Sequence, residues 1–135
     1  MKFPFPAIAS AFRDRRAVHQ PVPDVSATDI ERIVRRDFPK DEFDSTLAAL
    51  GQYGGSLPRE CPRVQLAALK LAQGDLQSLR RHIANAERDY RDVLAAAEYP
   101  RYMSAGMFRV RELSRKEQQA IVDSDWDQYQ RWLAK

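Results

Sequence analysis

The side chains that could take part in chemistry are few in this 135-residue chain, and they lie far apart in the sequence. There are two histidines, His19 and His82, and a single cysteine, Cys61. Zinc sites and cysteine proteases need such residues in set combinations, for example H-x-x-x-H, C-x-x-C or a cysteine with a histidine base. None of these patterns is present, so we expect no metal site, no cofactor and no cysteine-based catalysis.

Carboxylates are the other groups that could act as a general acid or base. They gather over 37–44 and over 87–98, where Asp89 and Asp92 flank Tyr90 and Arg91. Helix physics explains both groups, because acids are favoured at a helix N-terminus and residues four apart form surface ion pairs. A paired-carboxylate site stays open as an alternative, but the sequence favours a non-catalytic protein over a small enzyme.

Arginine clusters suggest a different function, the binding of phosphate. The candidate phosphate contacts are Arg13, Arg15 and Arg16 near the N-terminus, and Arg32, Arg35 and Arg36 on a predicted helix. The formal net charge is only +3, and acidic residues are interleaved with the arginines. A solvated helix surface is therefore favoured over a nucleic-acid interface, which remains the alternative.

The spacing of apolar residues predicts a helical hairpin at the centre of the domain. From Leu76 to Ala97 apolar positions recur every three or four residues, which predicts one continuous helix over about 75–98. The preceding segment, 62–73, is apolar on nearly every side, and Gly74 with Asp75 suits a tight junction between two helices. Seven residues of the hairpin should be largely buried: Leu66, Leu69, Leu71, Leu79, Ile83, Tyr90 and Val93.

Three further helices are predicted around the hairpin. They begin at Ser26, near residue 41 and at Ser114, and the two serines each precede an acid by three residues, as in a capping box. Leu47 is expected to face inward from the second of these helices. The segment 99–113 lacks the helical period, so we expect an apolar loop that covers the bundle.

The last predicted helix supplies a candidate partner surface. Its main apolar stripe consists of Val122, Trp126, Tyr129 and Leu133. Trp126 is therefore expected in the core. The shoulder of the stripe carries Ile121, Gln128 and Trp132, and such a mixture of apolar and polar groups is typical of an interface margin. This shoulder is the candidate contact for another protein or a second copy of the chain. The alternative, that a wide core face or the segment 99–113 covers Trp132, stays open.

Residues 1–24 form an N-terminal arm, and 25–135 form one helical domain. Prolines interrupt the arm, but it carries Phe3, Phe5, Ile8 and Phe12, which argues against a disordered tail and for docking on the domain. The predicted fold class is an all-α, compact bundle of about five helices. No apolar run is long enough to span a membrane, and the unpaired cysteine fits a reducing cytoplasm.

Three segments resemble a group of small bacterial helical proteins: RVQLAALKLAQGDLQSL, DYRDVLAAAEYP and DSDWDQYQRWL. The resemblance extends from Ile30 to Leu133 and implies a bacterial, cytoplasmic protein. No activity is assigned to that group, so no catalytic or ligand-binding residue is carried over. The sequence as a whole favours a non-enzymatic protein–protein interaction module, such as an adaptor, a regulatory subunit or an immunity-type inhibitor.

Overall fold

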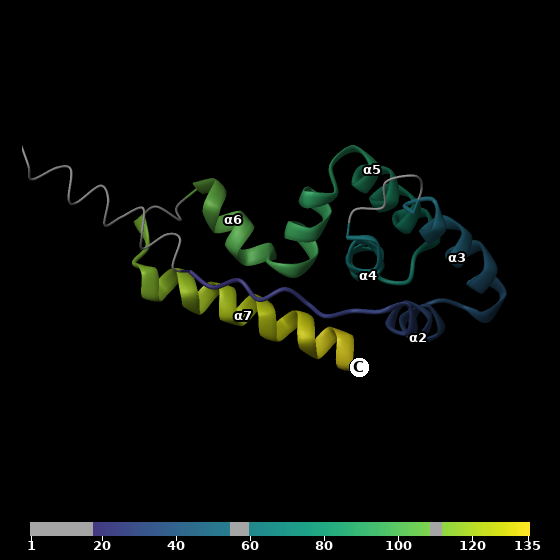
Figure 1. Ribbon diagram of the computed structural model, residues 1–135, viewed down its shortest axis with the longest axis horizontal. Coiled ribbons are helices and arrows are strands. Elements are labelled where there is room, and N and C mark those ends of the chain that lie inside the picture. The colour runs from purple at the N-terminus through teal and green to yellow at the C-terminus, as the bar shows by residue number, and fades with distance from the viewer. Residues whose placement is uncertain (1–17, 55–59, 109–111) are drawn as a thin grey trace, which may run out of the picture.

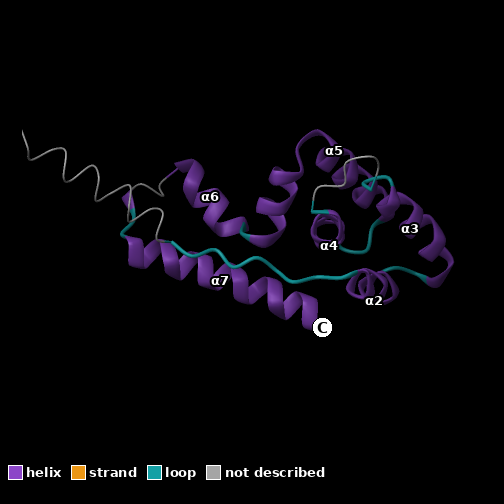
Figure 2. Ribbon diagram, viewed as in Figure 1, coloured by secondary structure: helices purple, strands orange, loops and turns teal. Residues whose placement is uncertain are grey.

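The computed structural model describes residues 18–54, 60–108 and 112–135. Within these ranges the chain is built from helices joined by loops and contains no strand, which confirms the predicted all-α fold class (Figure 2). The elements in chain order are α2 (Ala27–Asp37), the 3₁₀ helix η1 (Lys40–Glu42), α3 (Phe43–Gly51), α4 (Cys61–Ala72), α5 (Leu76–Glu98), α6 (Pro100–Phe108) and α7 (Arg115–Ala134).

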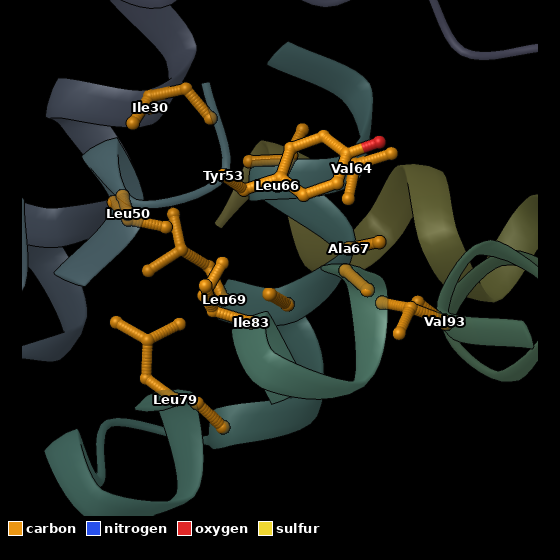
Figure 3. Close-up of a cluster of buried hydrophobic side chains, with 14 of the residues drawn as sticks. Ile30, Leu50, Tyr53, Val64, Leu66, Ala67, Leu69, Leu79, Ile83 and Val93 are labelled. Atoms are coloured by element: carbon orange, nitrogen blue, oxygen red, sulfur yellow. The ribbon is translucent and has the colours of Figure 1, made fainter. Parts of the chain in front are cut away.

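The predicted hairpin of α4 and α5 is confirmed, and it carries the centre of the core. α4 packs mainly on α5, and α2 and α3 pack against this pair (Figure 1). Leu66 and Leu69 of α4 are fully buried, and Leu69 lies beside Ile83 of α5 (Figure 3). Leu71 and Tyr90 differ from the prediction, because both are only partly buried at the edge of the core.

The turn between α4 and α5 also fixes the end of α2. Gly74 has φ +79°, a left-handed conformation that glycine adopts without strain. A Cβ atom at this position would lie 2.6 Å from the carbonyl oxygen of Asp37. Asp75 then caps α5, because its carboxylate accepts a hydrogen bond from the Ser78 N–H at 2.8 Å.

The helix predicted over 75–98 is not continuous, so that expectation was wrong. At Asp89 the backbone is extended, with φ −155° and ψ 98°. The Asp89 carboxylate accepts a hydrogen bond from the Arg91 N–H at 3.1 Å, so it caps the second half of α5. Aspartate competes well with helical hydrogen bonds because its short side chain reaches nearby backbone N–H groups.

A helix, α6, occupies Pro100–Phe108, where we expected a loop. Proline is tolerated at the first helical position because the N–H it lacks would have no helical partner there. The N–H groups of Arg101 and Tyr102 donate to the carboxylate of Asp125 on α7, at 3.3 and 2.8 Å. A residue from another helix therefore caps α6.

The buried face of α7 differs slightly from the one that the sequence predicted. Its buried residues are Gln118, Val122, Asp125 and Tyr129. Trp126, expected in the core, is only half buried and lies outside the core cluster, whereas Trp132 packs against that cluster. On α3 the prediction for Leu47 was also wrong, since this residue is 40% exposed.

Residues 18–25 form an extended segment that runs along α7 toward α2 (Figure 1). The Gln119 side chain on α7 accepts a hydrogen bond from the His19 N–H at 2.8 Å and donates one to the His19 carbonyl at 3.0 Å. This part of the predicted arm is thus docked, while 1–17 lie outside the described residues. None of the described helices is both long and apolar enough to cross a membrane.

Candidate functional site

Two of the predicted phosphate contacts bind the C-terminal end of α7. Arg32 Nη2 donates a hydrogen bond to the Leu133 carbonyl at 2.8 Å, and Arg36 Nη1 donates to the Trp132 carbonyl at 2.7 Å. The last carbonyls of a helix lack helical partners and carry partial negative charge, so cations are favoured there. These arginines of α2 therefore hold the end of α7 in place.

The other arginines are either engaged or outside the described residues. The guanidinium of Arg35 lies 5.8 Å from the centre of the Phe43 ring, a cation–π arrangement. Arg36 also pairs with Asp37, with Nε 2.7 Å from Oδ1. Arg13, Arg15 and Arg16 fall in the part of the chain that is not described.

A cleft of about 900 Å³ opens beside these contacts, between α2, α4 and α7. We call it the Trp132 cleft. It is lined by Arg36, Asp37, Lys70, Gln73, Gln128, Arg131, Trp132 and Lys135. Gln128 and Trp132 of the predicted partner surface thus lie in one cleft, and Ile121 of the same surface is not among the lining residues.

Lys70 is a half-buried cation of this cleft without a hydrogen-bond or ion-pair partner among the described residues. Its ammonium group forms no hydrogen bond or ion pair with any residue in the described ranges, whereas Arg36 pairs with Asp37 and Arg131 pairs with Asp127. Burial lowers the pKa of Lys70, and the negative charge of Asp125 opposes this effect. A half-buried ammonium has lost part of its hydration, so it gains from the approach of an anion.

The Trp132 ring is held by its neighbours on two elements. The Arg36 guanidinium lies 5.1 Å from the centre of the ring, and the Tyr129 ring centre lies 5.6 Å away at a tilt of 54°. The Gln128 amide reaches the Ala97 carbonyl at 3.5 Å. One wall of the cleft is therefore positioned before any ligand arrives, which lowers the entropic cost of binding.

The two histidines and the cysteine lie apart from the cleft. His19 is exposed on the extended segment, and His82 lies on α5, where burial lowers its pKa and the charge of Arg81 lowers it further. Cys61 begins α4, and burial raises the pKa of its thiol, which disfavours the reactive thiolate. In the described ranges no group of three or more His, Cys, Asp or Glu side chains could hold a metal ion.

The cleft residues that the sequence analysis missed, Lys70, Gln73, Arg131 and Lys135, come from α4 and α7 and the C-terminal ends of these two helices. One signal was available, because Lys70 is the only charged residue between Val64 and Ala72 in the most apolar helix. A lone charge in such a segment is expensive to bury unless it has a function or a partner. Gln73, Arg131 and Lys135 gave no comparable signal.

Comparison of the chain with protein-family models, curated proteins and solved structures found no match. The site is therefore interpreted from its own geometry and charge.

Proposed function

We propose that this chain is a non-catalytic protein-interaction module, and that its Trp132 cleft binds an acidic segment of a partner protein. The observation that carries the proposal is the half-buried ammonium of Lys70, which has no hydrogen-bond or ion-pair partner among the described residues. An anionic side chain placed in the cleft would restore the electrostatic stabilisation that Lys70 lost on leaving water.

The composition of the lining supports an acidic protein partner. The lining contains four cationic residues and only one acid, Asp37, which is already paired with Arg36. The Arg131–Asp127 pair is largely exposed, at 72% and 61%, so Arg131 can exchange its partner for a ligand at little free-energy cost. Trp and Arg are also the residue types that contribute most to protein–protein binding.

Nucleic-acid binding is less well supported than protein binding. It would use Arg32, Arg35 and Arg36, but these guanidinium groups contact helix carbonyls, the Phe43 ring and Asp37. Phosphate would have to compete with each of these contacts. The small net charge of +3 also gives little long-range attraction for a duplex.

The proposal can be tested with a fluorescently labelled oligoglutamate peptide and anisotropy titrations. Lys70→Gln should weaken binding about five- to tenfold, because the anchoring charge is lost and the side chain stays polar. Lys116→Gln is the matched control, since Lys116 is exposed on α7, about 24 Å along the helix from Trp132 at 1.5 Å per residue. It should change the affinity less than about twofold.

Two results would count against the proposal. Equal effects of the Lys70 and Lys116 substitutions would mean that only net charge matters and that the cleft is not the site. Tighter binding of a DNA duplex than of the peptide, with a steep dependence on salt, would favour the nucleic-acid alternative.

A further inference from the structure

A second cavity lies on a different part of the molecule, away from the Trp132 cleft. Its volume is about 460 Å³, and it is formed by the second half of α5, α6, the start of α4 and the extended segment 18–25. We call it the tyrosine pocket, because Tyr90, Tyr99 and Tyr102 line it. Pockets of about 300–1,000 Å³ with aromatic walls and a few polar groups are typical of small-molecule sites.

Two features give the tyrosine pocket its walls. The break at Asp89 begins the second half of α5, whose first residue, Tyr90, lines the pocket. The Tyr99 hydroxyl donates a hydrogen bond to the Pro21 carbonyl, which holds the extended segment in place as a further wall of the pocket. Burial also raises the pKa of Tyr99 to about 12, so this phenol keeps its proton at physiological pH.

Every charge that lines the tyrosine pocket is already paired. Arg63 donates two hydrogen bonds to Glu98, from Nε at 2.8 Å and from Nη2 at 2.7 Å, and the Glu98 side chain is only 2% exposed. Arg63 Nη1 also reaches Glu60 at 3.4 Å. Arg91, the remaining charged lining residue, pairs with Asp89 at 3.1 Å. A charged ligand would have to separate the buried Arg63–Glu98 pair or compete for the more exposed Arg91–Asp89 pair, whereas a neutral ligand would do neither.

The rim of the pocket is apolar and exposed. Val22 is 59% exposed and Met103 is 38% exposed, and only Leu47 is a further exposed large apolar residue among the described ones. A ligand in the pocket would cover part of this apolar surface, which is favourable. The Tyr90 and Tyr102 hydroxyl groups form no hydrogen bond with any described residue, so both can donate one to a ligand.

We propose that the tyrosine pocket binds an uncharged small organic molecule with an apolar body and a hydrogen-bond acceptor. The body packs against Leu94, Val22 and Met103, and the acceptor binds the hydroxyl of Tyr90 or Tyr102. We expect the ligand to be uncharged because each charged side chain that lines the pocket already forms an ion pair. This site is independent of the Trp132 cleft and of any acidic partner bound there.

Two neighbouring alanines of α5 offer a matched pair of variants. Ala95 lines the tyrosine pocket, while Ala96 lines a different cavity that contains His82 and Asn85. Both alanines are half buried. Ala95→Phe should fill the tyrosine pocket, and Ala96→Phe should leave it open.

The experiment measures binding of Nile red, an uncharged dye with a carbonyl acceptor, by its fluorescence. The wild-type chain should bind one equivalent with a blue-shifted emission, Ala95→Phe should weaken binding about tenfold or more, and Ala96→Phe should change it less than about twofold. Equal losses in both variants, or no saturable binding to the wild type, would overturn the proposal.

A second measurement uses the wild-type chain, so it remains valid even if one of the variants fails to fold. With methyl-¹³C-labelled methionine, the Met103 signal should shift as Nile red is added, because Met103 lies on the rim of the pocket. The signal is assigned with Met103→Leu. Dye binding that leaves the Met103 signal in place would show that the dye binds elsewhere and would contradict the proposal.

Discussion

Two carboxylates, Glu98 and Asp125, are almost completely buried, with 2% and 0% of their surface exposed. Each is stabilised by groups from another helix. Glu98 on α5 accepts two hydrogen bonds from Arg63 on α4, and Asp125 on α7 accepts two from the first turn of α6. A buried carboxylate without such partners would be strongly destabilising, so these residues determine how the helices are joined.

Arg63→Met should therefore lower the free energy of unfolding by about 3–5 kcal/mol at pH 7, because Glu98 is left buried and unpaired. Urea denaturation at pH 7 measures this deficit. Arg131→Met, which breaks an exposed pair, is the control and should have little effect. An equally small loss in Arg63→Met would mean that the pair with Glu98 does not stabilise the fold.

Tyr99→Phe should lower the free energy of unfolding by about 1 kcal/mol at neutral pH, because the hydrogen bond to the Pro21 carbonyl is lost. The raised pKa of Tyr99, about 12 against the ordinary value of 10.0, adds a dependence on alkaline pH. A folded-state pKa above the unfolded one gives stability that is complete below pH 10.0 and is lost as the pH rises toward about 12. Urea midpoints of the two proteins should thus converge in alkali; a constant difference would mean that the Tyr99 hydroxyl is not protected by burial.

At the scale of elements, a helix end could be predicted where its capping residues are neighbours in the sequence. Ser114 and Glu117 form the capping box expected from their spacing, with hydrogen bonds of 3.1 Å in both directions. α6 was missed because its cap, Asp125, comes from a different helix. The break at Asp89 was missed because its neighbouring charges match the ion pairs of a continuous helix equally well. The pattern of neighbouring residues therefore could not predict the cap of α6 or the break at Asp89.

Asp125→Ala should loosen α6 specifically. Two N–H groups in its first turn lose their acceptor, and we expect a loss of about 1–3 kcal/mol in the free energy of unfolding. Hydrogen exchange should accelerate in α6 and remain slow in α4. Asp123→Ala is the control on the same helix, since Asp123 is exposed and bonds only Gln119 among the described residues. Faster exchange throughout the protein would show that Asp125 supports the whole fold and not α6 alone.

Gly74→Ala tests the junction of the central hairpin with α2. An alanine there would be strained at φ +79°, and its Cβ would meet the Asp37 carbonyl at 2.6 Å, so the free energy of unfolding should fall by more than about 1 kcal/mol. Gly51→Ala should have the opposite sign, because a Cβ at Gly51 meets no atom within 4 Å and the helix end loses a flexible glycine. Thermal melts of both variants would reveal the contrast. A neutral Gly74→Ala would mean that the turn is free to move away from α2.

At the scale of the whole molecule, the fold class and the hairpin follow from the periodicity of apolar residues, because that pattern reports directly on which face is buried. The Trp132 cleft does not follow from it. Three helices meet there, and the approach of α7 to α2 depends on Arg32 and Arg36 binding its last carbonyls (Figure 1). Arginines that the sequence assigned to phosphate or solvent thus act in assembly. Of the cleft residues, Gln128 and Trp132 were predicted as a partner surface, and Lys70, a single charge in an apolar helix, was missed.

The central claim is that Lys70 anchors an acidic ligand in the Trp132 cleft. Its most direct test is trace acetylation of the lysines, quantified by mass spectrometry with and without excess oligoglutamate peptide. A bound carboxylate stabilises the protonated ammonium and covers it, and only the deprotonated amine reacts with the reagent. The account predicts several-fold protection of Lys70, with Lys40 and Lys116 unchanged. Equal protection of all three lysines, or none at Lys70, would contradict it.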